Sequence, residues 1–360
     1  MRPETNSDVS AEAVETFMEK VLGDYAGANA FFMAAIGDRL GLFKDLAARG
    51  PATSPELASR TGLHERYLRE WLAGMTAAGY LSYQPATGRY TLPAEHAPVL
   101  AEEAGRFFLG CAFFDYSTNY GPTFHRLLGA FRDGGGVPQD LFGTEMAEAI
   151  DRFTAPWCEH LLVPEWLPAM PDVLAKLHAG ATVADVGCGR GRAVITLAQA
   201  FPACSVVGYD VYQPAVGVAQ GRAAAAGLSD RVRFEVRDVV EGLPQRYDVI
   251  TTFDVVHDAA DPRGLLRAIH DSLEPDGRYL CVEITCAERP EDNVGPLSTI
   301  MYGLSLAYCM TVSLADGGAG LGTLGLPEAK LTELASETGF SQVRRVPIED
   351  PFNTLYVLTP

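Results

Sequence analysis

The chain has 360 residues, 48% of them hydrophobic, a length at which two domains with separate cores are expected. Its formal net charge of -18 opposes non-specific attraction to DNA, RNA and anionic membranes, and we find no apolar run as long as a membrane span. Seven cysteines without a Cys-x-x-Cys pair predict reduced thiols, a cytoplasmic protein and no metal site.

The first predicted elements are helices. After a polar start that lacks the apolar stretch of a signal peptide, apolar residues at helical spacing predict one helix over residues 12–23 and a second over 26–40. The second is nearly all apolar, which suits burial in a core or against a partner chain. Ser54 is expected to cap a third helix, with Pro55 in its first turn.

A fourth helix and a hairpin complete this region. Residues 64–79 predict the helix, and two short strands near 80–83 and 89–92 bracket a turn. Helix, turn, helix and hairpin form a winged-helix pattern. Such a unit can bind DNA, but the fourth helix offers only Arg66 and Arg69 as cations beside two glutamates, so we expect no nucleic-acid partner.

Residues 101–167 are expected to be mostly helical and are rich in aromatic side chains. Most of these rings suit a hydrophobic core. Because they directly precede the last domain of the chain, a few are candidates to line a substrate pocket. Tyr120 and Trp157 are the candidates from this region.

From Asp172 the pattern alternates between strands and helices, which predicts a mostly parallel sheet. Its central stretch is a β-branched run ending at Val186, then a cluster of glycines, then a helical segment from Arg192. Glycines let such a turn approach a ligand closely, and the amides that begin the helix suit an anionic group. A dinucleotide fingerprint would need glycine at position 192, where arginine stands.

The turn has the pattern Asp-x-Gly-x-Gly-x-Gly, from Asp185 to Gly191. It resembles motif I of the class I S-adenosylmethionine-dependent methyltransferases, whose glycines pass the methionine part of the cofactor. Asp210 ends the next strand, at the spacing at which a carboxylate meets ribose hydroxyls in nucleotide-binding folds. The resemblance implies a cofactor site made by Asp185, Gly187, Cys188, Gly189, Gly191, Asp210, Val211, Asp238, Val239, Phe253 and Asp254.

The loop after the fourth strand contains His257, followed by Asp258. Ligands and chemistry collect at the carboxyl ends of parallel strands, and an imidazole that titrates near neutrality can accept a proton from a hydroxyl group. His257 is therefore the candidate general base. The alternative is a polar loop residue packed beside the cofactor.

This loop resembles the His-Asp-Trp-Ser-Asp region of the two-domain small-molecule O-methyltransferases, with alanine in place of tryptophan. The resemblance makes His257 the catalytic base, with Asp258 beside it. Glu283, at the end of the next strand, matches the acid that orients the base. Those enzymes carry a further glutamate where this chain has Gly325, with Glu328 nearby. Their winged helix is a dimerisation domain, so the resemblance also implies a homodimer.

Residues 293–324 form a segment that a cofactor-binding domain alone would not require. The apolar run 296–312 is compatible with a helix and supplies Met301, Tyr302 and Tyr308, which are either further substrate-pocket residues or core side chains. The glycine-rich stretch 316–325 is either a lid or a flexible connection.

The chain closes with a helix over 328–338 and a strand near 342–346. A last strand, carrying the sequence FNTLYVL from Phe352, resembles the final strand of these methyltransferases and is expected to lie antiparallel at the edge of the sheet.

We therefore predict an α/β protein with a winged-helix dimerisation domain at residues 1–100, a helical linker and pocket region at 101–167, and a Rossmann-like, seven-stranded methyltransferase domain at 168–360. The resemblance includes features of an actinobacterial branch of the family. It implies S-adenosylmethionine as methyl donor, S-adenosylhomocysteine as product, and no metal.

The expected reaction is methylation of a small aromatic or otherwise apolar metabolite, with oxygen as the favoured acceptor. Function does not follow from fold, so three alternatives stay open. They are carbon or nitrogen methylation, a non-methylating reaction such as decarboxylation or hydroxylation that uses the cofactor's positive charge, and a cofactor-responsive DNA-binding regulator.

Overall fold

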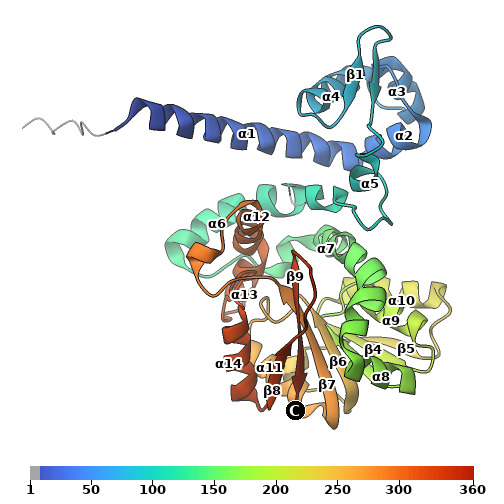
Figure 1. Cartoon of the computed structure of the whole chain (residues 1–360), viewed down its shortest axis with the longest axis vertical. Coiled ribbons are helices and arrows are strands. Elements are labelled where there is room, and N and C mark those ends of the chain that lie inside the picture. The colour runs from blue at the N-terminus through green and yellow to red at the C-terminus, as the bar shows by residue number, and fades with distance from the viewer. Residues whose placement is uncertain (1–8, 115) are drawn as a thin grey trace, which may run out of the picture. The chain divides into compact units, whose positions relative to one another are not determined.

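The computed structural model describes residues 9–114 and 116–360, so the polar start at residues 1–8 lies outside the described residues (Figure 1). The chain separates into two compact units, Met1–Tyr116 and Ser117–Pro360. Each unit has its own hydrophobic core.

The first unit consists of helices and a two-stranded hairpin (Figure 1). Its elements are α1 (Ala11–Arg39), α2 (Leu42–Arg49), α3 (Ser54–Thr61), α4 (Glu65–Ala77), β1 (Ser82–Gln84), β2 (Arg89–Thr91), α5 (Ala97–Leu100) and the short 3-10 helix η1 (Gly110–Phe114). The strands pair antiparallel with Tyr83 opposite Tyr90. Buried side chains that include Phe43, Leu57 and Leu72 join α2, α3 and α4 into one core.

Two predicted features of this unit are wrong. The two helices expected before residue 40 are one continuous helix, α1, because an internal glycine such as Gly23 costs only about 1 kcal/mol. The cap of α3 is Thr53 rather than Ser54. The Thr53 hydroxyl accepts a hydrogen bond from the amide of Glu56, and the Glu56 carboxylate accepts one from the amide of Thr53. Each side chain therefore gives the backbone N–H group of the other residue a partner.

The second unit begins with helices that lead to the sheet. They are η2 (Tyr116–Tyr120), α6 (Gly121–Asp133), η3 (Gln139–Leu141), α7 (Gly143–Trp157), η4 (Cys158–Trp166), η5 (Leu167–Ala169) and α8 (Pro171–Ala179). Two of them, η2 and η4, have π-helical geometry, which is frequent at functional sites.

A seven-stranded sheet forms the centre of the second unit, which confirms the predicted α/β fold (Figure 1). Its strands are β3 (Thr182–Val186), β4 (Ser205–Asp210), β5 (Val232–Val236), β6 (Tyr247–Phe253), β7 (Leu273–Ile284), β8 (Gln342–Arg345) and β9 (Asn353–Thr359), in the order β5-β4-β3-β6-β7-β9-β8. The first five are parallel, and β9 is antiparallel to both of its neighbours.

The expected edge position of the last strand is wrong, because β9 lies between β7 and β8 and the edge strand is β8. Burial gives the reason. All residues of β9 except Thr359 are buried, as an internal strand requires, whereas β8 has exposed residues at both ends.

Helices cover both faces of the sheet. The remaining helices of the second unit are α9 (Arg192–Ala200), α10 (Gln213–Ala225), η6 (Val239–Glu241), α11 (Pro262–Asp271), η7 (Pro290–Asp292), α12 (Pro296–Leu304), η8 (Ser305–Cys309), α13 (Met310–Ala315) and α14 (Glu328–Thr338). One core contains side chains of α8, α9 and α10, and the other contains side chains of α11 and α14.

The run Pro296–Ala315, made of α12, η8 and α13, corrects the expectation that no apolar stretch reaches the length of a membrane span. Its 20 residues have a mean hydropathy of 1.4, so by length and composition alone this helix could cross a membrane. The core helix of a soluble protein passes the same test. Here Met301, Ala307 and Tyr308 are buried within the second unit.

Candidate active site

The glycine-rich turn joins β3 to α9, and hydrogen bonds connect it to β4. The amides of Gly187 and Cys188 both donate to the carbonyl of Tyr209, at 2.8 and 2.9 Å. Gly187, Gly189 and Gly191 have positive φ angles, which glycine adopts at no steric cost. A Cβ at Gly187 or Gly191 would clash with neighbouring side chains, whereas a Cβ at Gly189 would meet nothing within 4 Å. The turn therefore presents open backbone at Gly189.

Asp210 ends β4 and holds this turn. Its carboxylate accepts hydrogen bonds of 2.8 Å from the amide of Gly189 and from the amide of Tyr212. Burial raises the pKa of Asp210, and these backbone hydrogen bonds oppose the rise. A carboxylate has about four acceptor sites, so Asp210 keeps capacity for further donors next to Gly189.

Asp185, the first residue of the motif, is 2% exposed. It accepts a hydrogen bond of 2.6 Å from the hydroxyl of Thr251, its register partner on the neighbouring strand β6. Burial raises the pKa of Asp185 to about 7, against the opposing effect of the Thr251 hydrogen bond. Asp185 thus connects two central strands directly before the turn.

The other cofactor candidates follow the strands next to β3. Val211 comes after β4 and is exposed, and Val239 begins η6 and is buried. Asp238 caps η6, because its carboxylate accepts from the amide of Val240 at 3.0 Å. Phe253 is the last residue of β6. Since β5, β4, β3 and β6 are parallel neighbours, their carboxyl ends share one edge of the sheet.

Asp254 follows β6 with a backbone angle φ of 56°, and it is the single non-glycine residue with positive φ in the described part of the chain. Its Oδ1 atom is buried and has no hydrogen-bond partner among the described residues. Burial raises the pKa of Asp254 to about 8, although the charge of His257 opposes the rise. Strain of this kind collects at functional sites, because the surrounding structure must enforce it.

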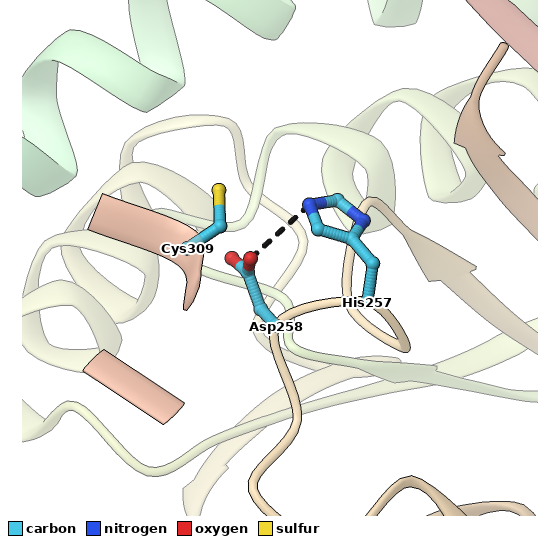
Figure 2. A group of neighbouring side chains, drawn as sticks. All are labelled: His257, Asp258 and Cys309. Carbon is cyan, nitrogen blue, oxygen red and sulfur yellow. Dashed lines mark ion pairs between the residues drawn. The ribbon is translucent and has the colours of Figure 1, made fainter. Parts of the chain in front are cut away.

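His257 lies three residues further on and is 2% exposed. Its Nδ1 atom is 2.5 Å from Oε2 of Glu283, and the other carboxylate oxygen of Glu283 accepts from the amide of Val256 at 2.8 Å. Nε2 of His257 lies 3.1 Å from Oδ1 of Asp258 (Figure 2). The structure therefore brings the three predicted catalytic residues together, with one carboxylate at each nitrogen of the ring.

These carboxylates control the protonation of His257. Burial alone would lower the pKa of the imidazole, but the charges of Asp258 and Glu283 outweigh it and raise the pKa well above the usual value. The Nδ1 contact with a carboxylate favours the tautomer in which Nε2 is the proton acceptor. An imidazole oriented in this way can act as a general base once Nε2 has lost its proton.

Cys309 is a neighbour of this group that the sequence did not indicate. It comes from η8, and its Sγ atom is within 4.8 Å of the ligand atoms of His257 and Asp258 (Figure 2). A lone cysteine carries no motif, so only the fold could place it here.

The glycine-rich stretch 316–325 is bound to the loop that carries His257. The amide of Gly322 donates to the carbonyl of His257 at 3.2 Å, and the amide of Ala319 donates to the carbonyl of Ala260 at 2.8 Å. The buried Ser313 hydroxyl donates to the carbonyl of Ala259 and accepts from the amide of Gly320. These contacts make the stretch a support of the candidate base.

The five substrate-pocket candidates lie in different surroundings. Trp157 and Met301 are buried in a hydrophobic core, and Trp157 contacts the ring of Phe352. Tyr120 and Tyr302 are about two-fifths exposed. Tyr308 is nearly buried, and its hydroxyl hydrogen-bonds to the amide group of Gln139. Their role in binding substrate stays a prediction.

A second feature that sequence reasoning missed is an ion cluster around Asp151 on α7. This carboxylate is 6% exposed and accepts paired hydrogen bonds from Arg192 and from Arg222, at 2.8 to 3.1 Å. Arg190 of the glycine turn lies 3.9 Å away. The cluster thus connects α7 to the end of the turn, to the start of α9 and to α10. No local sequence motif predicts this cluster, because its charged residues come from three separate segments.

Comparison with known proteins identifies the two parts of the chain separately. Residues 28–102 match the Rv2258c-like winged HTH domain, and residues 177–305 match a methyltransferase domain. A ubiquinone biosynthesis O-methyltransferase of Pseudomonas syringae is 33% identical over 101 residues, which are 28% of this chain and 43% of that protein. The chain therefore matches less than half the length of this relative.

Two relatives from Streptomyces match most of the chain. The 3-hydroxy-5-methyl-1-naphthoate 3-O-methyltransferase of Streptomyces sahachiroi is 28% identical over 86% of each chain. The mitomycin biosynthesis 6-O-methyltransferase of Streptomyces lavendulae is 26% identical, over 80% of this chain and 82% of that protein.

Solved structures share the fold over nearly the whole chain. The mitomycin 7-O-methyltransferase MmcR superimposes with a TM-score of 0.70 and 21% identity, over 98% of this chain and all of that one. Human N-acetylserotonin methyltransferase, solved with SAM, has a TM-score of 0.69 and 19% identity, over 99% of both chains. The structure of PigF holds SAH, has a TM-score of 0.69 and 22% identity, and covers 95% of this chain and 99% of that one.

Proposed function

We propose that this chain, a two-domain S-adenosylmethionine-dependent methyltransferase with an N-terminal winged-helix domain, methylates a hydroxyl oxygen of a small aromatic metabolite. The observation that carries the proposal is the buried contact between His257 and Glu283, at the sheet edge that also bears the glycine turn. The two relatives that match most of the chain are O-methyltransferases, and one is named for a hydroxynaphthoate.

The residues of the turn fit the proposed cofactor. Gly189 offers open backbone, and Asp210 beside it keeps acceptor capacity for ribose hydroxyls. The turn and Asp210 belong to β3 and β4. Asp238 follows β5 and Asp254 follows β6, the strands that flank this pair, and both residues would complete the cofactor site. S-adenosylmethionine supplies a methyl group that is already activated on a sulfonium, so this chain has to align the acceptor and remove its proton.

His257 takes that proton in the proposed mechanism. Glu283 holds Nδ1 and leaves the lone pair of Nε2 for the acceptor hydroxyl. The acceptor must therefore approach the side of the ring that faces Asp258. When the acceptor hydroxyl gives up its proton, Nε2 would take it, and the two carboxylates would stabilise the resulting imidazolium. No step of this proposal uses a metal.

The test is to incubate the purified protein with S-adenosylmethionine carrying a deuterated methyl group and a panel of hydroxylated aromatic acids. Mass spectrometry should find a product with the label on oxygen. In His257→Ala we expect turnover to fall by about 100-fold or more while cofactor affinity stays near that of the wild type. His178→Ala, an exposed histidine on α8, is the matched control and should keep full turnover.

Three outcomes would contradict the proposal. Normal turnover in His257→Ala removes His257 from the mechanism. A label on carbon or nitrogen identifies another acceptor. A product formed without consumption of the cofactor indicates a non-methylating enzyme.

We further propose that the protein is cytoplasmic and works as a homodimer through its winged-helix unit. The support for the dimer is the exposed apolar surface of α1 together with the match of residues 28–102 to a winged-helix domain.

A further inference from the structure

Three side chains with metal-binding atoms converge beside the candidate base. His257 and Asp258 come from the loop after β6, and Cys309 comes from η8, 51 positions later in the chain. Figure 2 shows the three as neighbours, with the His257 ring and the Asp258 carboxylate facing each other. Their imidazole nitrogen, carboxylate oxygen and sulfur all lie within 4.8 Å of one another. Imidazole, carboxylate and thiolate together are the ligand set that Zn²⁺ prefers.

The spacing within the group also fits a shared ligand. Oδ1 of Asp258 is a buried atom and lies 3.1 Å from Nε2 of His257. Around one tetrahedral Zn²⁺, bonds of about 2.0 to 2.3 Å put nitrogen, oxygen and sulfur ligands roughly 3 to 4 Å apart. The observed separation of Nε2 and Oδ1 falls in that range.

A histidine that binds a metal through one ring nitrogen usually has a hydrogen-bond partner on the other, and Glu283 is that partner here. Nδ1 of His257 contacts Oε2 of Glu283, and the amide of Val256 fixes the other carboxylate oxygen. A carboxylate on the far nitrogen is the usual support of a metal-bound imidazole, because it sets the tautomer and the ring orientation. The alternative grouping of Asp254, His257 and Glu283 would need Nδ1, which Glu283 already holds.

We propose that Nε2 of His257, Oδ1 of Asp258 and Sγ of Cys309 bind a thiophilic divalent cation, with Zn²⁺ as the best match, and that the bound ion inhibits the enzyme. The metal–sulfur bond replaces the S–H bond of Cys309, whose proton passes to solvent. Inhibition follows because the ion occupies the lone pair of Nε2. This second part rests on the proposed role of His257 as base, whereas binding of the ion does not.

Binding is tested with the full chain after treatment with a chelator. Calorimetry should show one Zn²⁺ per chain, and Co²⁺ should produce the near-ultraviolet band of a thiolate ligand. In Cys309→Ser we expect the Co²⁺ band to disappear and the affinity for Zn²⁺ to fall by about tenfold or more. Cys286→Ser, which changes another partly exposed cysteine, is the matched control and should behave as the wild type. Equal Zn²⁺ affinity in Cys309→Ser and the wild type would overturn the proposal.

Inhibition is tested by adding Zn²⁺ or Mg²⁺ to the methyl-transfer assay. Zn²⁺ should inhibit the wild type, Mg²⁺ should not, and Cys309→Ser should need about tenfold more Zn²⁺ for the same inhibition. Unchanged or increased turnover with Zn²⁺ bound would overturn the inhibitory part. If no acceptor is methylated at all, the proposed function fails, and the Co²⁺ band still decides the metal site.

Discussion

At the scale of single residues, the two carboxylates on the ring of His257 have different effects. Glu283 is buried and held by the amide of Val256, so it orients the ring. Asp258 is about one-third exposed and faces the nitrogen that would accept the proton. Both charges raise the pKa of His257, but only Asp258 occupies the side that the acceptor must approach.

The first prediction concerns the pH dependence of turnover. A base works only when deprotonated, so a raised pKa moves the acid side of the profile of kcat/KM to higher pH. Asp258→Asn removes one of the charges that raise the pKa of His257. We therefore expect the acid side of the profile to move to lower pH by about one unit.

Its measurement is kcat/KM across the pH range for the wild type and for Asp258→Asn. Asp271→Asn, an exposed position at the end of α11, controls for the loss of one negative charge elsewhere. An acid limb that stays in place, or that moves to higher pH, argues against His257 as the titrating base.

At the scale of elements, the stretch 316–325 is hydrogen-bonded to the loop that carries His257. A substitution in this stretch can show whether these contacts matter for turnover. Gly322 has φ of 75°, and a Cβ there would lie 2.2 Å from the hydroxyl oxygen of Ser305. Its amide donates to the carbonyl of His257. In Gly322→Ala we expect kcat to fall by about tenfold, because the displaced stretch shifts the base, while cofactor affinity remains.

Gly317 gives a matched control in the same stretch. Its φ is 69°, but a Cβ there would meet nothing within 4 Å, so Gly317→Ala introduces only the backbone strain. Steady-state kinetics and calorimetry with S-adenosylhomocysteine separate the two effects. Similar losses of kcat in both variants would mean that strain alone, rather than the clash with Ser305, explains the result.

The cluster around Asp151 makes a prediction about stability and cofactor binding. Burial alone would raise the pKa of Asp151, but the hydrogen bonds from Arg222 and Arg192 outweigh it and lower the pKa. The stabilisation is therefore present at neutral pH and is lost as pH falls through the lowered pKa. Asp151→Ala should lower the free energy of unfolding by roughly 2 kcal/mol, because partly buried guanidinium groups lose their buried partner.

We expect the same variant to bind S-adenosylhomocysteine more weakly, since Arg190 and Arg192 belong to the turn and to the start of α9. Urea unfolding and calorimetry measure the two effects. Glu148→Ala changes a half-exposed acid on the same helix, 3.9 Å from Arg190, and should be close to neutral. Wild-type stability in Asp151→Ala would show that the cluster contributes nothing.

These elements also show how far the sequence could predict the molecule. The strands β3 to β6 were predictable, since each is a short apolar run with turn residues or an acid at its end. The contact of Thr251 with Asp185 was not predictable from the sequence, because it depends on which strands are neighbours. Cys309, Asp151 and the anchoring of Gly322 were missed for the same reason. Each joins segments far apart in the chain, and no local pattern encodes such a pairing.

At the scale of the whole molecule, the first half of α1 has no packing partner within the described part of the chain. Residues 9–29 are all exposed, and they include an apolar stripe at helical spacing: Val14, Phe17, Met18, Val21, Leu22 and Tyr25, each 48 to 69% exposed. Most of the stability of a protein helix comes from packing of its apolar face, which this half of α1 lacks. A contiguous apolar stripe of this kind is a candidate protein interface.

The second half of α1 contains the residues that do pack, Ala34, Ala35 and Gly37. The core of the first unit therefore holds only the end of the helix, and the stripe remains for a partner. A second copy of this chain meets the requirement, because two identical stripes can bury each other around a twofold axis. The winged-helix match begins at residue 28, after the stripe, so the stripe is not part of the matched domain.

Charges placed in the stripe test whether it forms a dimer interface. Phe17→Glu combined with Val21→Glu places two charges in the stripe, and we expect a dimeric wild type to become monomeric. Light scattering after gel filtration measures the mass, and circular dichroism should show lower helix content in the variant, because the first half of α1 loses its partner. Glu19→Lys, at an exposed position between these two, tests whether any charge change suffices and should leave the dimer intact. A monomeric wild type, or a double variant that remains dimeric, would show that the stripe is not the dimer interface.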